Sequence, residues 1–105
     1  RNLLRTTQVL ELQAPAILVG YHGGPGSRYG VINHAFHPYA LRCNGQTWTE
    51  TGLTAMVAGH FGVPTVAITG DRAAIREAEP QVPGIRGIVV KEGISRLAGA
   101  SLHPE

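Results

Sequence analysis

The stretch LTAMVAGHFGVPTVAITGD, residues 53–71, places a helical pattern directly before a strand pattern. Its first apolar side chains recur at three- and four-residue spacing until Gly62 and Pro64 end the repeat, which predicts an amphipathic helix. Residues 63–69 are a short apolar run and predict a buried strand. The side chains of the helical stripe are Leu53, Met56, Val57, His60 and Phe61.

Toward the C-terminus, the same alternation of helix and strand continues. Asp71 is placed to N-cap a helix through about Glu79, with Pro80 as its stop. Residues 87–91 predict another buried strand, and residues 94–102 predict a closing helix. We therefore expect an α/β fold with βαβ crossovers and a mostly parallel sheet.

Toward the N-terminus, residues 16–21 form another apolar run of strand length. It leads into a loop over residues 23–30 that contains four glycines and a proline, which disfavour regular structure. Asn44-Gly45 is a strong hairpin signal between residues 39–43 and 46–48, because both turn positions need a positive φ. A β-hairpin insertion is therefore predicted in the α/β fold.

The composition is that of a single globular domain: 105 residues, 43% hydrophobic and 15% charged, with a formal net charge of +2. The basic residues are scattered, so nucleic acid and acidic membranes are not expected partners. The lone Cys43 excludes an internal disulfide, and no apolar run approaches the roughly 20 residues that span a bilayer. We expect a cytoplasmic protein that binds small molecules or short peptides, and residues 1–105 to be a single partial domain cut at both ends.

His22 follows a predicted buried strand and therefore lies at the sheet edge where α/β proteins bind ligands. The alternative is a histidine that only caps a loop. Glu50 extends the inward stripe of the next helix by one turn, which would direct a carboxylate into the protein. Thr47 and Glu50 also match a capping box, in which Glu50 would only accept from the Thr47 backbone N–H.

His34 and His37 form an H-x-x-H pair just past the glycine loop. Such a pair could ligate a metal or exchange protons near neutral pH, although surface histidines are the commoner explanation. Cys43 lies within a predicted hairpin strand and is expected to serve packing, and the N-cap role explains Asp71.

An ordered set of motifs resembles the DppA-type zinc-dependent D-aminopeptidase family, of which the chain would be a central segment. The resemblance implies that His22 of the GYH motif and Glu50 of the E-x-G-L motif are zinc ligands, and that His34 of the G-V-x-x-H motif is catalytic. It also implies a site with two zinc ions, release of N-terminal D-amino acids from short peptides, and a homo-oligomer. The motifs are Val19-Gly20-Tyr21-His22, Gly30-Val31-Ile32-Asn33-His34, Asn44-Gly45, Glu50-Thr51-Gly52-Leu53, Gly62-Val63-Pro64 and Thr69-Gly70-Asp71.

The chain also departs from the family pattern. Members of that family carry an Asp-x-Glu motif and a further upstream histidine as metal ligands, whereas the one aspartate here is Asp71. His22 and Glu50 cannot by themselves complete two zinc spheres. The chain as given is therefore expected to be inactive and incomplete relative to the full family domain.

Two other functions fit parts of the sequence. The run from His22 to Gly26, HGGPG, resembles the oxyanion loop of α/β-hydrolase-type serine peptidases, but the segment around Ser95 lacks the second glycine of a G-x-S-x-G elbow. The other alternative is a non-catalytic relic domain that is retained for assembly or peptide binding.

Overall fold

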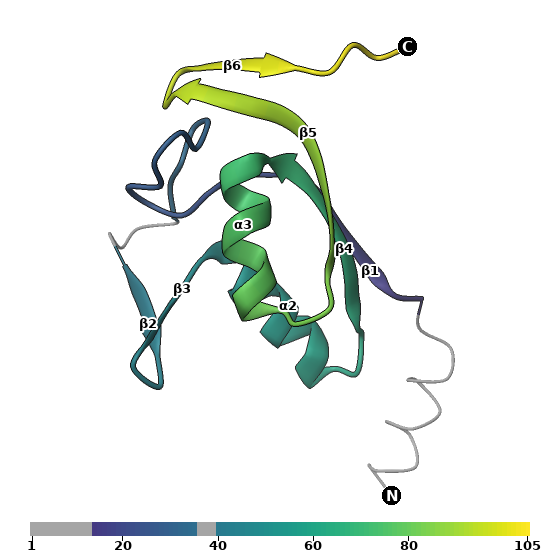
Figure 1. The fold of residues 1–105 in the computed structure, drawn as a ribbon. Coiled ribbons are helices and arrows are strands. Elements are labelled where there is room, and N and C mark those ends of the chain that lie inside the picture. Colours follow the sequence, from purple (N-terminus) through teal and green to yellow (C-terminus); the bar gives the residue numbers. More distant parts are fainter. Residues whose placement is uncertain (1–13, 36–39) are drawn as a thin grey trace, which may run out of the picture.

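The computed structural model describes residues 14–35 and 40–105, which form a four-stranded sheet, a two-stranded sheet and two helices (Figure 1). The larger sheet has the strand order β1-β4-β5-β6, and the smaller pairs β2 with β3. The elements are β1 (Ala16–Tyr21), β2 (Leu41–Cys43), β3 (Gln46–Trp48), α2 (Glu50–His60), β4 (Thr65–Asp71), α3 (Arg72–Gln81), β5 (Arg86–Ser95) and β6 (Ala98–Ser101).

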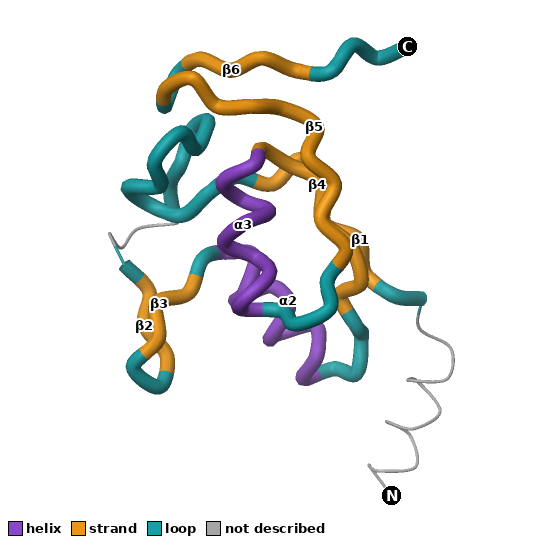
Figure 2. The backbone as a smooth tube through the Cα atoms, in the orientation of Figure 1, coloured by secondary structure: helices purple, strands orange, loops and turns teal. Residues whose placement is uncertain are grey.

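The larger sheet is mostly parallel, as the sequence predicts. β1 pairs with β4 and β4 with β5 in parallel, while β6 runs antiparallel to β5. The sheet curls around α3, which packs against β4 and β5, and α2 lies on the same side (Figure 2). The α/β fold with crossovers and a hairpin insertion is therefore confirmed.

The predicted hairpin is present as β2 and β3, with Asn44 and Gly45 both at positive φ, 50° and 77°. Its first strand begins at Leu41, and Tyr39 lies outside the described residues. β4 begins two residues later than predicted. The reason is that the Val63 N–H still donates to Ala58 of α2, at 2.9 Å, and thereby terminates that helix.

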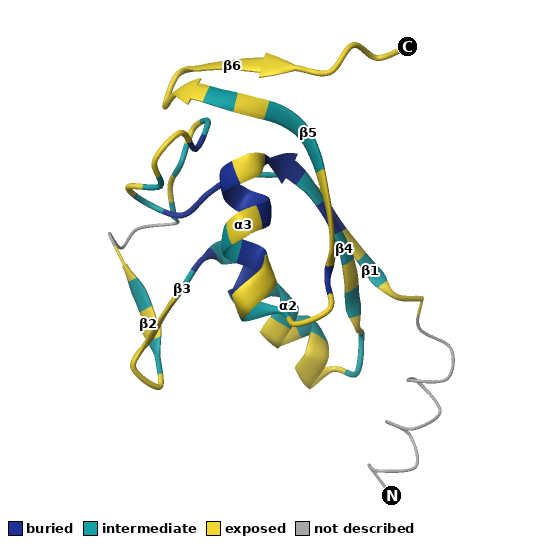
Figure 3. Ribbon diagram, in the orientation of Figure 1, coloured by how far each residue is buried: buried dark blue, intermediate teal, exposed yellow. Residues whose placement is uncertain are grey.

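The core lies between the sheet and α3 (Figure 3). Small side chains let the helix approach the strands, since Ala74 and Ala78 are 1% and 0% exposed. The larger members of this core are Leu18 from β1, Ile68 from β4, Ile75 from α3 and Ile85 before β5.

Gly70 fixes how closely β4 approaches the end of β1. A Cβ at this buried position would overlap the carbonyl oxygen of Tyr21, which is backbone and cannot rotate away. We expect Gly70→Ala to lower the free energy of unfolding by about 1–3 kcal/mol, as overpacking does. Gly59→Ala, at an exposed helical position with open space around it, is expected to raise stability by about 0.5–1 kcal/mol. Urea unfolding measures both, and equal shifts in the two variants would contradict the close approach.

The predicted closing helix over residues 94–102 is wrong. β5 continues to Ser95 and returns as β6, with Glu92 opposite Ala100 and Gly93 opposite Gly99. Gly99 within this segment costs a helix about 1 kcal/mol, whereas the antiparallel ladder satisfies the same backbone groups. The β5–β6 hairpin also contacts the segment just after the glycine loop, because the Arg96 carbonyl accepts from the Ile32 N–H at 2.7 Å.

The two helices differ from their predictions in detail. α3 passes through Pro80 and ends at Gln81, whose side-chain amide donates to the Glu77 carbonyl at 2.9 Å and stabilises the last turn. α2 ends at His60, before Gly62 as predicted, but its apolar stripe does not face the core. Met56 and Phe61 are 43% and 61% exposed, and the buried residues of α2 are Thr51 and Gly52.

An exposed ion pair joins the start of α3 to β5. Arg72 Nε donates to Glu92 Oε1 at 2.7 Å, and this guanidinium lowers the pKa of Glu92. A depressed carboxyl pKa stabilises the fold above the unfolded-state pKa, and this contribution is lost as the pH falls through the folded-state value. Because both side chains are exposed, water screens the pair and the effect on stability is small.

Candidate metal centre

His22 follows directly after β1, at the edge of the sheet where the parallel strands β1 and β4 end. Its side chain is 20% exposed. Its Nδ1 lies 3.0 Å from the Gly23 carbonyl oxygen. A carbonyl oxygen only accepts hydrogen bonds, so Nδ1 is the donor in this contact and Nε2 is left to face Glu50.

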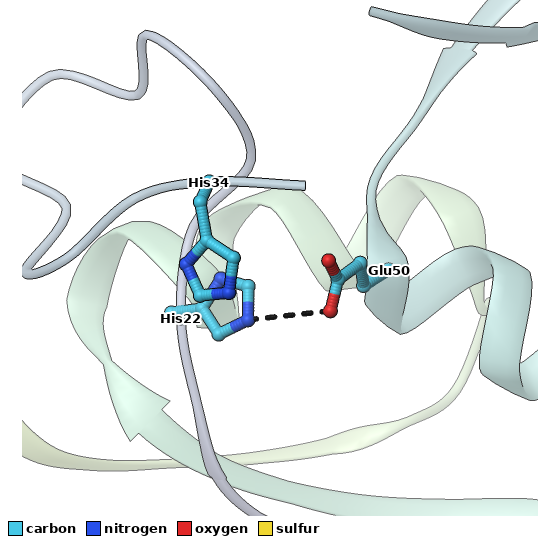
Figure 4. Close-up of side chains that lie close together, drawn as sticks. All are labelled: His22, His34 and Glu50. Carbon is cyan, nitrogen blue, oxygen red and sulfur yellow. Dashed lines mark ion pairs between the residues drawn. The ribbon is translucent and has the colours of Figure 1, made fainter. Parts of the chain in front are cut away.

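Glu50 is the first residue of α2, and its carboxylate faces His22 (Figure 4). Glu50 Oε2 lies 3.4 Å from His22 Nε2, and its side chain is 13% exposed. The capping-box alternative is wrong, because the helix begins at Glu50 with Thr49 as the N-cap residue and has no side-chain cap bond. Thr49 is held instead by Gln81 of α3, whose Oε1 accepts from the Thr49 N–H at 3.0 Å.

His34 stacks on His22 from the segment that follows the glycine loop, with ring centroids 3.7 Å apart and planes inclined by 18°. Its Nδ1 lies 2.6 Å from the Ile32 carbonyl oxygen, so Nδ1 again carries the proton and Nε2 remains free. Ile32 is at φ 52°, a region that β-branched residues rarely adopt, and its N–H is held by the Arg96 carbonyl. The β5–β6 hairpin thus maintains a strained backbone next to His34, as is common at functional sites.

The arrangement of donors fits a metal ion. One ligand atom each from His22, His34 and Glu50 lies within 4.8 Å of the others. Two ligand atoms that each lie about 2.0–2.2 Å from a tetrahedral zinc ion are roughly 3.3–3.5 Å from one another. His22 Nε2 and Glu50 Oε2 are 3.4 Å apart, which matches this separation. Within residues 14–35 and 40–105, the buried Glu50 Oε1 has no hydrogen-bond partner, an arrangement that costs free energy unless a cation compensates the charge.

The structure separates the other sequence candidates from this cluster. Asp71 is fully buried and N-caps α3 as predicted, accepting from the Ala74 N–H at 2.8 Å. Its second oxygen accepts from the Val31 N–H at 2.8 Å, directly after the glycine loop, a contact that the sequence did not indicate. Cys43 is a half-buried free thiol in β2, and His37 lies outside the described residues.

The oxyanion-loop alternative does not fit the geometry. The Gly24 N–H donates to Glu77 Oε2 at 2.8 Å and the Gly26 N–H to Asn33 Oδ1 at 3.3 Å, so these amides are occupied. Ser95 lies at the end of β5, where the chain returns in a second strand rather than entering a helix. A nucleophile elbow requires a strand-to-helix turn.

The fold and the cluster define an α/β protein with two histidines and a carboxylate that could hold a metal ion, gathered next to the end of β1. Comparison with known proteins makes this class specific: the model of peptidase family M55, described as D-aminopeptidase, matches residues 5–105, so the chain belongs to this family. The resemblance noted in the sequence is thereby confirmed.

Two similar proteins come from Bacillus subtilis. A D-aminopeptidase of strain 168 is 37% identical over 91 residues, which are 85% of this chain and 33% of the relative. A solved structure, described as the Zn-dependent D-aminopeptidase DppA, a self-compartmentalizing protease, matches with a TM-score of 0.75 and 35% identity over 86% of this chain and 33% of that one. The chain thus spans about a third of the length of these relatives. Among the described residues, no helix has the length and apolar character needed to cross a membrane.

Proposed function

We propose that this chain carries part of the metal site and the catalytic histidine of a zinc-dependent aminopeptidase that releases N-terminal D-amino acids from short peptides. The cluster of His22, His34 and Glu50 is the observation that carries the proposal. The family membership supports the peptidase class, and the zinc dependence of the similar B. subtilis structure supports the metal.

His22 and Glu50 would hold the metal. Zinc, when bound, polarises a carbonyl group and lowers the pKa of a bound water toward neutrality. His22 Nε2 offers a lone pair because its Nδ1 proton is fixed by Gly23. Glu50 Oε2 faces that nitrogen, and Glu50 Oε1 would be available to a second cation in a complete site with the two zinc ions that we propose.

His34 would act as the general acid or base. Its ring orientation is fixed by stacking on His22 and by the Nδ1 bond to Ile32, which leaves Nε2 to exchange a proton. In peptide hydrolysis this atom would take a proton from the attacking water or give one to the departing amine. A short peptide is the partner that this chemistry requires, and neither nucleic acid nor a membrane is part of the proposal.

The larger context of the chain is also proposed. We propose that residues 1–105 are a single partial domain of a larger metallohydrolase that forms a cytoplasmic homo-oligomer, a state consistent with the description of the similar structure as self-compartmentalizing. His22 and Glu50 are fewer ligands than two zinc ions need, so the chain as given is proposed to bind metal without efficient hydrolysis. A relic domain retained for assembly or peptide binding would bind no metal.

Replacing His34 separates catalysis from metal binding. In the protein produced from its complete reading frame and loaded with zinc, His34→Ala is expected to slow release of D-alanine from D-alanyl-D-alanine by about 10²–10⁴-fold, the usual contribution of a general acid–base group. Zinc content should remain that of the wild type, and His60→Ala, at an exposed position of α2, should leave both unchanged. Full activity in His34→Ala, or equal cleavage of the L,L-dipeptide, would contradict the assignment.

A further inference from the structure

We propose that Glu77 of α3 is a positioning residue for the metal centre and that it acts through the peptide group between Gly23 and Gly24. The inference rests on the proposed function, since it concerns how His22 is prepared to hold a metal. It assigns a role in the site to a helix that contributes none of the three clustered donors.

Both oxygens of the Glu77 carboxylate are committed to the glycine loop. Oε2 accepts from the Gly24 N–H at 2.8 Å, and Oε1 accepts from the Ser27 hydroxyl. Glu77 is half-buried and Gly24 is buried, so water competes little for the amide bond. Hydrogen bonds to an ionised acceptor are about twice as strong as neutral ones, which lets this carboxylate fix the orientation of the loop.

The opposite side of the same peptide group meets both histidines. The N–H of Gly24 and the carbonyl of Gly23 belong to one peptide bond, and that carbonyl accepts from His22 Nδ1 at 3.0 Å and from the His34 backbone N–H at 3.3 Å. A peptide whose N–H donates to a carboxylate becomes polarised, and its oxygen becomes a better acceptor.

The result is a relay from a carboxylate through a peptide to a histidine. Metal-binding histidines commonly donate their second ring N–H to a carboxylate or a backbone carbonyl, which fixes the tautomer and raises the basicity of the ligating nitrogen. Here Glu77 strengthens the carbonyl that holds the Nδ1 proton of His22. The ring therefore presents Nε2 toward Glu50.

Close packing explains why two glycines stand at this peptide. A Cβ at Gly23 would lie 2.7 Å from Ser27 Oγ, and a Cβ at Gly24 would lie 2.9 Å from Thr49 Cγ2. Both approaches are shorter than ordinary contacts. A side chain at either position would therefore shift the loop against Ser27 or Thr49 and disturb the bonds that Gly24 and Ser27 donate to Glu77.

The test uses Glu77→Met, which keeps length and removes the acceptor, and Glu77→Gln, whose amide can still accept from Gly24 and donate to Ser27. Glu79→Met is the matched control, because Glu79 is exposed on the same helix. Long-range ¹H–¹⁵N spectra of the metal-free chain report the His22 tautomer, and competition with a chelator gives the zinc dissociation constant. We expect Nδ1–H to dominate in wild type, Glu77→Gln and Glu79→Met. In Glu77→Met we expect mixed tautomers and about 10-fold or more weaker zinc binding.

An unchanged His22 tautomer and zinc affinity in a folded Glu77→Met variant would overturn the relay. If circular dichroism shows that this variant does not fold, two measurements on the wild type decide instead: the hydrogen-exchange rate of the Gly24 amide and the tautomer of His22. A slowly exchanging amide together with the Nδ1–H tautomer supports the relay. A rapidly exchanging amide, or the Nε2–H tautomer, overturns it. Failure of the wild type to bind zinc would instead refute the proposed function. The two failures can be told apart because the His22 tautomer is measured on the metal-free chain.

Discussion

Glu50→Gln is expected to weaken zinc binding by more than ~100-fold, beyond the 10–100-fold that loss of an outer-shell partner costs. The substitution keeps the size of the side chain but removes the charge that faces His22 Nε2 at 3.4 Å. A neutral amide offers one oxygen, so the buried Oε1 position also loses its capacity to meet a cation. Metal analysis after dialysis and a chelator competition measure the effect.

Glu79→Gln is the control for that experiment, because it removes the same charge from an exposed position. Its zinc content and affinity should equal those of the wild type. Unchanged zinc content in Glu50→Gln would remove Glu50 from the site.

Asp71→Ala is expected to lower the free energy of unfolding by about 2–4 kcal/mol. The loss combines an N-cap, worth about 0.5–2 kcal/mol, with an unpaired donor in the loop, worth about 1–3 kcal/mol. The two donors are the N–H groups of Ala74 and Val31, each at 2.8 Å from a carboxylate oxygen that is fully buried. Urea denaturation measures the change.

Asp71→Asn separates the two contributions, because its side chain keeps one acceptor oxygen. It should lose about half as much stability as Asp71→Ala. Amide exchange at Val31 and Ala74 identifies which bond remains. A loss under about 1 kcal/mol in Asp71→Ala would show that the carboxylate does not join α3 to the loop.

The sequence predicts the part of the candidate site that lies next to periodic elements. His22 ends an apolar run and Glu50 precedes a helical stripe, so the sheet edge and the helix start bring them together. His34 could be selected only through the family resemblance, because the irregular loop that positions it has no period to extrapolate.

Contacts between distant segments explain what the sequence does not show. Glu77 and Gly24 are 53 residues apart, and Asp71 and Val31 are 40 apart, so neither pair leaves a local pattern. One feature of the sequence points to Glu77. It lies four residues before Gln81, a spacing that places two polar side chains on one helix face.

The wrong predictions have related causes. The final segment became β6 because pairing with β5 outweighs the apolar spacing that suggested a helix. The stripe of α2 was expected to face the core, but Met56 and Val57 lie exposed in the described part of the chain. Periodicity identifies the helix and one apolar face, while tertiary packing decides whether that face is covered.

The central claim is that an imidazole at the end of β1 and a carboxylate at the start of α2 share one cation. A crystal structure of the zinc-soaked chain, with anomalous scattering recorded at the zinc edge, tests it most directly. We predict an anomalous peak within about 2.0–2.2 Å of both His22 Nε2 and a Glu50 oxygen. An occupied zinc elsewhere, with no peak between these two side chains, would contradict the account.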